Sequence, residues 1–122
     1  MAEIRSYVDL LVWQKGLELV EEVYRVIGAF PPDERYALGA QIRRSVVSVP
    51  SNIAEGQTRQ HTGEFRQFLY ISLGSLAELD TQLIIATRLN YVPGDVHSTI
   101  REKIVELRKM LSSLIKKLNS GD

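Results

Sequence analysis

Hydrophobic side chains recur along the chain at the three- and four-residue spacing of α-helices, in four separate segments. Short breaks rich in proline, glycine and polar residues separate the segments, and no stretch alternates as a β-strand does. We therefore expect helices at about residues 10–29, 34–55, 63–89 and 96–118. Four helices with short connections predict an all-α fold, an antiparallel up-down-up-down four-helix bundle that forms one domain over residues 1–122.

Residues that stop or start helices mark the breaks. In the "FPPDE" sequence after the first segment, the prolines cannot continue a helix, and the acidic pair suits the positive end of the next one. Gly56 is a usual helix-stop residue, so we expect it to end the second helix. Thr62 is the expected N-cap of the third helix. The "NYVPGD" sequence forms the third break.

Pro50 lies inside the second predicted helix. Proline deletes one backbone hydrogen bond and presses on the carbonyl of Val46, which costs about 3 kcal/mol or more in an ordinary helix. Ser51 and Asn52 lie close enough in sequence for their side chains to satisfy the carbonyl that proline leaves free. We therefore predict one continuous helix that is bent at Pro50.

Two of the predicted helices carry more apolar surface than one core contact needs. A helix facing one core uses an apolar arc of roughly 100°. The first helix is apolar over nearly half its circumference, and the third is apolar nearly all round. In a bundle of four, no helix is surrounded by its own chain, so the excess predicts a contact between subunits. Burial in a membrane is not expected, because charged residues interrupt the apolar run of the third helix: Arg66, Glu78, Asp80 and Arg88.

Composition removes several classes of function. The 15 basic residues equal the 15 acidic residues, so overall charge points to no particular partner. The chain has no cysteine, which excludes disulfides, thiolate metal sites and a cysteine nucleophile. No apolar run approaches the ~20 residues of a membrane span, and the N-terminal sequence lacks a signal-peptide layout. We expect a cytoplasmic protein of bacteria or archaea with no membrane partner.

The residues that usually perform catalysis are not arranged for it. His61 and His97 fall in or near predicted loops, outside any Glu-x-x-His pair, and are expected to be solvated surface residues. Glu78 and Asp80 are two residues apart and point in different directions on a helix. Gly74 matches no phosphate-loop spacing and is expected to permit close helix approach. The sequence predicts no enzyme, no metal site and no cofactor.

A stripe of polar residues borders the apolar side of the second helix, and the third helix offers matching groups. Buried polar groups must be hydrogen-bonded or each costs about 1–3 kcal/mol. We interpret the set as a hydrogen-bonded seam that fixes helix register, with a ligand site as the alternative. This polar seam comprises Gln41, Arg44, Ser45, Ser48, Asn52 and Glu55 on the second helix and Ser72, Ser75, Glu78 and Asp80 on the third.

Four stretches carry a family resemblance: "VWQKG", "FPPDERYALGAQIRRSVVSVPSNIAEG", "FLYISLGSLAELDTQL" and "LNYV". They resemble the small four-helix-bundle proteins encoded in ribosomal RNA intervening sequences, over about residues 9–92, with the last helix matched by pattern only. That family is similar in fold to the accessory variability determinant of diversity-generating retroelements, a barrel-shaped homopentamer. The resemblance implies a bundle in a ring of five, no known catalytic activity, no catalytic residues to transfer, and an association with RNA-linked genetic elements.

Basic residues concentrate in two regions despite the balanced total charge. The solvated face of an amphipathic helix is the simpler interpretation, and binding of RNA or DNA is the alternative. No aromatic residue is interleaved with them in the sequence, so we expect phosphate contacts rather than base stacking. The basic residues are Arg101, Lys103, Arg108, Lys109, Lys116 and Lys117 in the last helix and Arg43, Arg59 and Arg66 around the second loop.

Three functions remain open from the sequence. The leading hypothesis is a non-catalytic homo-oligomer, a pentamer by resemblance, that binds nucleic acid or a nucleoprotein partner through basic patches. The second is a ring scaffold that binds protein only. The third, and weakest, is an enzyme with a site between subunits around Arg44, Asn52, Glu55 and Glu78.

Overall fold

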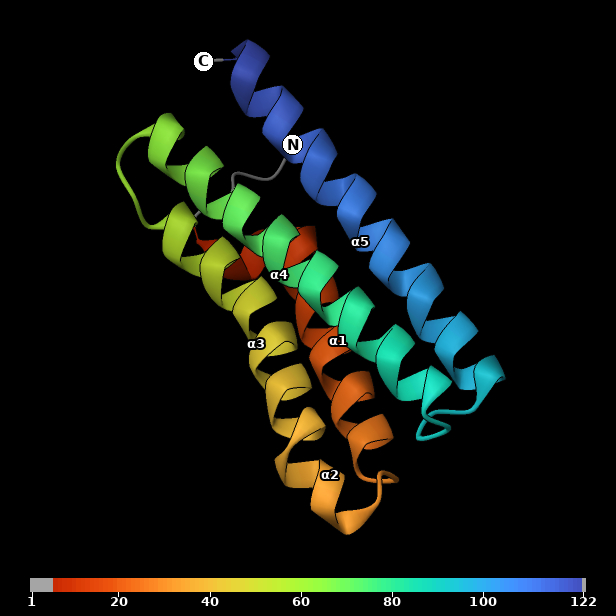
Figure 1. Ribbon diagram of the computed structural model, residues 1–122. Coiled ribbons are helices and arrows are strands. Elements are labelled where there is room, and N and C mark those ends of the chain that lie inside the picture. Colours follow the sequence, from red (N-terminus) through yellow and green to blue (C-terminus); the bar gives the residue numbers. More distant parts are fainter. Residues whose placement is uncertain (1–5, 122) are drawn as a thin grey trace.

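The computed structural model describes residues 6–121, and the regular elements in this range are all helical (Figure 1). Four long helices and one short helix that starts with proline form the all-α fold that the sequence predicts. The elements are a 3₁₀ turn η1 (Tyr7–Asp9), α1 (Leu11–Ile27), α2 (Pro32–Tyr36), α3 (Leu38–Gln57), α4 (Thr62–Arg88) and α5 (Gly94–Gly121).

The long helices pack as a bundle in which each helix has two main neighbours. α3 packs against α1 and α4, and α5 packs against α4 and α1. Successive long helices run in opposite directions, as Figure 1 shows, so the predicted up-down arrangement is confirmed. The helices enclose one hydrophobic core, whose largest fully buried side chains are Phe30, Leu19, Ile27, Ile42, Ile53, Leu69, Leu76, Leu79, Leu83, Ile104, Leu107 and Leu111.

The second predicted helix, 34–55, is in fact two helices. The chain breaks at Ala37, where φ is −99° and ψ is −92°, between α2 and α3. The reason is tertiary: a Cβ atom on Gly39 would lie 2.9 Å from Cγ2 of Ile27, so the first turn of α3 is packed tightly against the end of α1. The predicted acidic first turn is present in α2, which holds Asp33 and Glu34.

Two predicted helix ends are wrong. Gly56 does not end α3, which continues to Gln57; instead Gly56 is buried, and a Cβ atom there would lie 2.6 Å from Cβ of Phe68 on α4. This glycine therefore allows two helices to approach closely. Thr62 is the first residue of α4 rather than its cap, and His61 occupies the cap position without a side-chain bond to the helix.

The C-terminus of α4 ends in a hydrogen-bonded helix-stop motif. Asn90 has a left-handed backbone, with φ of 66°. Its N–H donates to the Thr87 carbonyl at 3.0 Å, and the N–H of Tyr91 donates to the Ala86 carbonyl at 2.9 Å. This pair of bonds is the Schellman motif, which satisfies carbonyls at a helix C-terminus. Asparagine tolerates the left-handed conformation better than most residues do.

Pro50 is buried within an uninterrupted α3, so the predicted continuity is confirmed, whereas the bend stays a prediction. Its ring faces α1. A Cβ atom on the buried Gly16 would lie 3.2 Å from Cβ of Pro50, closer than most such contacts. Glycine on one helix and proline on the other therefore let α1 and α3 approach closely at the middle of the bundle.

The carbonyls next to Pro50 are bonded differently from our prediction. The side-chain amide of Asn52 donates to the Ser48 carbonyl at 2.8 Å rather than to that of Val46. From α4, the fully buried Ser72 hydroxyl donates to the Val49 carbonyl at 2.8 Å. A neighbouring helix thus supplies part of the hydrogen bonding around the proline.

α4 also carries an exposed apolar surface, which we call the outer face of α4 and define by Ile71, Gly74, Ile85 and Leu89. A Cβ atom on Gly74 would meet nothing within 4 Å, so the close approach expected at this glycine is not made within the chain. α4 is long and apolar enough to cross a membrane by length and composition, with 39% of its most apolar window buried. A core helix of a soluble bundle passes the same test, so the expected absence of a membrane partner stays a prediction.

Candidate functional site

Part of the predicted polar seam forms a hydrogen-bonded link between α3 and α4. The hydroxyls of Ser48 and Ser75 share a hydrogen bond of 2.8 Å across the two helices. The side-chain amide of Asn52 donates to the same Ser48 hydroxyl at 2.9 Å. One turn away, Ser72 bonds the backbone of α3. These four side chains are half-buried or buried, so their bonds are made largely away from water and constrain the register of the helices.

Other members of the seam lie outside this link. Ser45 is buried but donates to the carbonyl of Gln41 in its own helix, at 3.1 Å. Glu55 is exposed and pairs with Arg59 at 3.0 Å. Asp80 was wrongly assigned to the seam: it faces α5, where its carboxylate pairs with Nε of Arg101 at 3.2 Å. Glu78 and Asp80 are two residues apart, which corresponds to about 200° around the helix axis, so their side chains point in different directions.

Beside the link lies a polar hollow of about 390 Å³ between α3 and α4. Its lining includes Arg44 and Glu78, which bear opposite charges and are not paired with each other or with other described residues. Gln82 is more than nine-tenths buried, and its Oε1 has no hydrogen-bond partner among the described residues. We missed Gln82 in the sequence, although it continues the spacing of Ser75 and Glu78. The hollow is lined by Gln41, Arg44, Ser45, Ser48, Glu78 and Gln82.

Ion pairs divide the basic residues of α5 into two groups. Near the start of the helix, Arg101 pairs with Asp80 and Lys103 pairs with Glu22 of α1. These pairs link α5 to α4 and to α1, so the two cations are largely neutralised. Further along α5, Arg108 and Lys109 are exposed and form no ion pair with any described residue. The unneutralised charge therefore lies in the second half of the helix.

The structure separates Arg43 from the other two arginines of the second basic region expected from the sequence. Arg43 lies in the first third of α3, with its guanidinium 5.8 Å from the centre of the Tyr24 ring. Arg59 lies just beyond the other end of α3, about 24 Å away along the helix. It is neutralised by Glu55. Arg66 is half-buried in the first turns of α4. Arg43 is thus separated from Arg59 by most of the length of α3, whereas Arg59 and Arg66 lie on either side of the short connection between α3 and α4.

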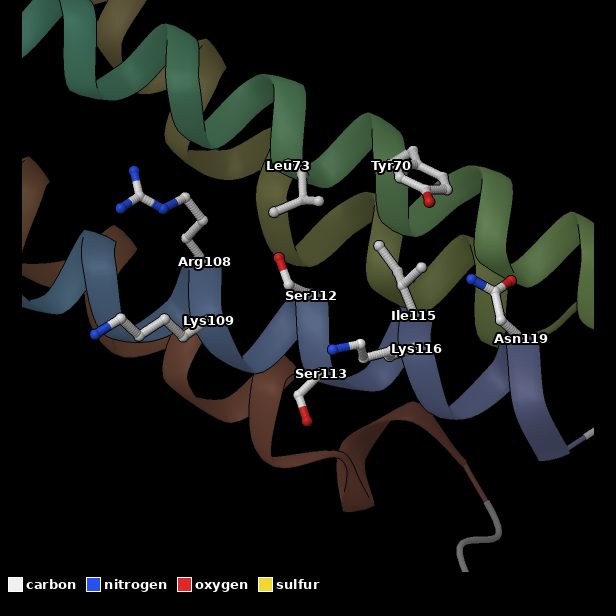
Figure 2. A pocket seen from close by; sticks show the side chains of 9 residues that line it. All are labelled: Tyr70, Leu73, Arg108, Lys109, Ser112, Ser113, Ile115, Lys116 and Asn119. Carbon is white, nitrogen blue, oxygen red and sulfur yellow. The ribbon is translucent and has the colours of Figure 1, made fainter.

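A second hollow, of about 530 Å³, lies between α4 and the basic half of α5. Figure 2 shows Tyr70 and Leu73 on α4 facing Ser112 and Ile115 on α5, with basic side chains around them. None of the lining side chains is acidic, so the hollow is electropositive. It is lined by Tyr70, Leu73, Arg108, Lys109, Ser112, Ser113, Ile115, Lys116 and Asn119.

The structure revises the expectation that aromatic residues are absent from the basic region. Tyr70 is 38 residues before Arg108 in the sequence, but helix packing makes them part of the same hollow. The Tyr70 side chain is 55% exposed. Sequence spacing alone could not find this pair, because it depends on which faces of α4 and α5 meet.

The histidines differ in environment. His61 is exposed at the start of α4, as expected. His97 lies in the first turns of α5, near the preceding loop as expected, but it is not a solvated surface residue: it is half-buried, and its Nε2 is buried without a partner among the described residues. Within residues 6–121, no three His, Asp or Glu side chains gather closely enough to hold a metal ion.

One ionisable group is clearly perturbed. The hydroxyl of Tyr91 donates to the Glu34 carboxylate at 3.1 Å, linking the loop after α4 to α2. This hydrogen bond, together with burial and the negative charge of Glu34, raises the pKa of Tyr91 above its ordinary value of 10.0. Tyr91 therefore stays protonated at neutral pH and acts in structure rather than in proton transfer.

Comparison with known proteins gives two findings. Residues 8–113 match the model of a family described as 23S rRNA-intervening sequence protein. A crystal structure of a protein of unknown function from the S23 ribosomal protein family of Bacteroides thetaiotaomicron is similar, with a TM-score of 0.81 and 26% sequence identity, over 87% of this chain and 99% of that one. No curated protein matches the chain.

Proposed function

Because the chain belongs to the 23S rRNA-intervening sequence protein family, we propose that it is a non-catalytic, oligomeric accessory module that binds nucleic acid, alone or in a nucleoprotein partner. The observation that supports this proposal most is the electropositive surface on the second half of α5. No acidic side chain lines it, and its Arg108 and Lys109 form no ion pair with a described residue, whereas the cations at the start of the same helix are paired.

Attraction for nucleic acid is expected from the positive charge on the second half of α5 rather than from the total charge of the protein. With a balanced total charge, the protein gains no general attraction for polyanions. Arg108 and Lys109 are exposed and unpaired among the described residues, so phosphate groups can approach them without displacing a carboxylate. Each cation that replaces a counterion on a nucleic acid adds affinity that falls with salt. Binding is therefore expected to be electrostatic and to show little sequence preference.

Self-association is the second part of the proposal. The outer face of α4 exposes Ile71 beside Gly74, where open space would admit a helix of another subunit, and exposes Ile85 and Leu89 about 16–22 Å further along the same helix. We propose a homo-oligomer, with five subunits as the family resemblance implies. A ring would repeat the basic surface once per subunit, so weak contacts on each copy would add up on one long nucleic acid.

Light scattering on a sizing column tests the oligomer. A mass of five subunits at micromolar concentration would support the ring, a dimer or tetramer would refute only the ring size, and a monomer would refute self-association.

Gel-shift titrations with structured RNA and duplex DNA, at low and moderate salt, test nucleic-acid binding. The double variant Arg108→Gln/Lys109→Gln should weaken binding and reduce the salt slope by about 1–2, since each lost phosphate contact contributes roughly 0.7–0.9. Arg101→Gln/Lys103→Gln is the matched control: it removes the same two charges from the same helix, but these residues are already paired with Asp80 and Glu22, so binding should change little.

Two results would count against the proposal. Absence of binding by the wild type at low salt would leave no role for the basic surface in nucleic-acid recognition. An equal loss of affinity in the control and the double variant would show that total charge, rather than the second half of α5, determines binding.

A protein-binding scaffold is the alternative, favoured by a separate apolar groove between α1 and α5. This groove has a volume of about 480 Å³, and its lining is mainly apolar, including the exposed Leu11 together with Met110 and Leu114. Recovery of the oligomer from native cells, with identification of bound nucleic acid and protein, discriminates the two functions. A partner protein that is lost with Leu11→Lys, in the absence of nucleic acid, would favour the scaffold.

A further inference from the structure

We propose that the hollow between α4 and α5 binds an unpaired nucleotide of a single-stranded nucleic acid, with its base stacked on Tyr70 and its phosphates held by basic side chains of α5. The inference rests on the proposed function, because it requires nucleic-acid binding, and it deepens that function by naming the single strand as the preferred form. It replaces our expectation of phosphate contacts alone.

Tyr70 has the properties of a stacking platform. It lies on a long, rigid helix, where 55% of its side chain is exposed. Several other aromatic rings are already occupied: Phe30 packs with Tyr91, and the Arg59 guanidinium covers Phe68. Among the described residues, the Tyr70 ring contacts neither another ring nor a cation. Its π-face is therefore available to a base.

The surroundings of the ring match the rest of a nucleotide. Arg108 and Lys109 supply positive charge for phosphates, and the lining contains no carboxylate to repel them. Ser112 and Asn119 lie on the α4 side of α5 and offer a hydroxyl and an amide to ribose or to a base edge (Figure 2). The volume of about 530 Å³ is within the roughly 300–1,000 Å³ of small-molecule sites.

This combination selects a single strand over a duplex. In a duplex the bases are stacked on one another and cannot reach Tyr70, so only the outer cations would be used. An unpaired base adds a stacking contact that tolerates any sequence. An acidic protein segment would use the cations equally well but would gain nothing from an exposed aromatic ring in the hollow. Tyr70 is one helical turn from Gly74, so the site borders the outer face of α4 that we assign to self-association.

Fluorescence anisotropy with labelled oligouridine, oligothymidine and an RNA duplex of equal length tests the inference. Tyr70→Leu should weaken binding of the single strands about 5- to 150-fold, the range for loss of one stacked base, and leave duplex binding unchanged. Tyr70→Phe should retain single-strand binding, because it keeps the ring. Tyr36→Leu is the matched control, since Tyr36 is 83% exposed on α2 and lines neither hollow. A further titration with oligodeoxyuridine, which carries the same base as oligouridine, tells whether ribose contributes.

A second measurement uses the wild-type protein. Oligouridine that carries 4-thiouridine is photocrosslinked to the protein, and tryptic peptides are analysed by mass spectrometry. The crosslink should fall in the peptide of residues 67–88, at Tyr70.

The outcomes separate the inference from the function on which it rests. Single-strand binding that is unaffected by Tyr70→Leu, or crosslinks only elsewhere, would overturn the stacking site and leave phosphate binding in place. Equal loss of single-strand and duplex binding in Tyr70→Leu would also overturn it, because stacking contributes only to the single strand. No binding of any nucleic acid at low salt would refute the proposed function as well.

Discussion

Gly56→Ala tests whether close contact between α3 and α4 depends on a missing side chain. The added Cβ atom would lie 2.6 Å from Cβ of Phe68 and 3.2 Å from the carbonyl oxygen of Phe65. Neither atom is the end of a flexible side chain, so rotation of a side chain cannot relieve the contact. α4 itself must move away from α3. Such a movement would strain the Ser48–Ser75 hydrogen bond further along the same interface.

Two opposing free-energy contributions determine how Gly56→Ala changes the stability of the protein. Alanine in place of glycine within a helix stabilises it by up to about 1 kcal/mol. Overpacking of a core usually costs about 1–3 kcal/mol, and a contact this short belongs in the upper part of that range. We therefore expect Gly56→Ala to lower the free energy of unfolding by about 1–2 kcal/mol. For a chain of this length that corresponds to a fall in melting temperature of roughly 3–10 °C.

Urea unfolding followed by far-ultraviolet circular dichroism measures this change, at one fixed protein concentration because self-association would add stability. Gly63→Ala is the control. This residue also lies in a helix, but its added Cβ atom would meet only the end of the Arg66 side chain, at 3.8 Å. The control should be unchanged or slightly stabilised. A Gly56→Ala protein as stable as the wild type would refute the reasoning, since it would show that the helices separate at no cost.

Three further predictions follow from other parts of the structure. Asn52→Leu should lower stability by about 1 kcal/mol, because it removes two hydrogen bonds to Ser48; an unchanged thermal melt would mean that these bonds contribute nothing. The unfolded chain loses the Tyr91 proton near pH 10.0, before the folded chain does, so stability should fall above that pH and fall less in Tyr91→Phe; equal alkaline unfolding curves would contradict this. Gly74→Arg should reduce the mass measured by light scattering, and an intact oligomer would place the interface elsewhere.

Hydrophobic spacing was sufficient to predict the long helices and their antiparallel order, since each apolar stripe must face a common core. It was insufficient at the helix ends. A glycine at position 56 reads as a stop because sequence alone does not reveal Phe68 packed against it. Similarly, the break at Ala37 follows from the contact between Gly39 and Ile27, which are twelve residues apart. Contacts of this kind exist only after the helices have packed.

Some contacts of the candidate site could also be predicted from the sequence, and others could not. Ser48 and Ser75 could be paired from the sequence, because each lies in a polar stripe beside a core stripe and the two helices are neighbours. The ion pair between Asp80 and Arg101 could not be predicted from the sequence, because a carboxylate at position 80 is equally compatible with the polar seam. In the sequence, Tyr70 is one of many apolar residues of the third predicted helix. Its place beside the α5 cations depends on the rotation of α4 about its own axis, which spacing does not fix.

The buried proline of α3 also bears on how the bundle opens and closes. Pro50 has no amide hydrogen, and the carbonyl of the preceding residue accepts the hydroxyl of Ser72 from α4. The middle of α3 therefore depends on a neighbouring helix for its order, and a helix that contains proline is a poor candidate to form alone. In native-state hydrogen exchange, amides on both sides of Pro50 should open together with those of α4 around Ser72, as one cooperative unit. The two helices would then lose their protection in a single step, while the last turns of α5 exchange earlier.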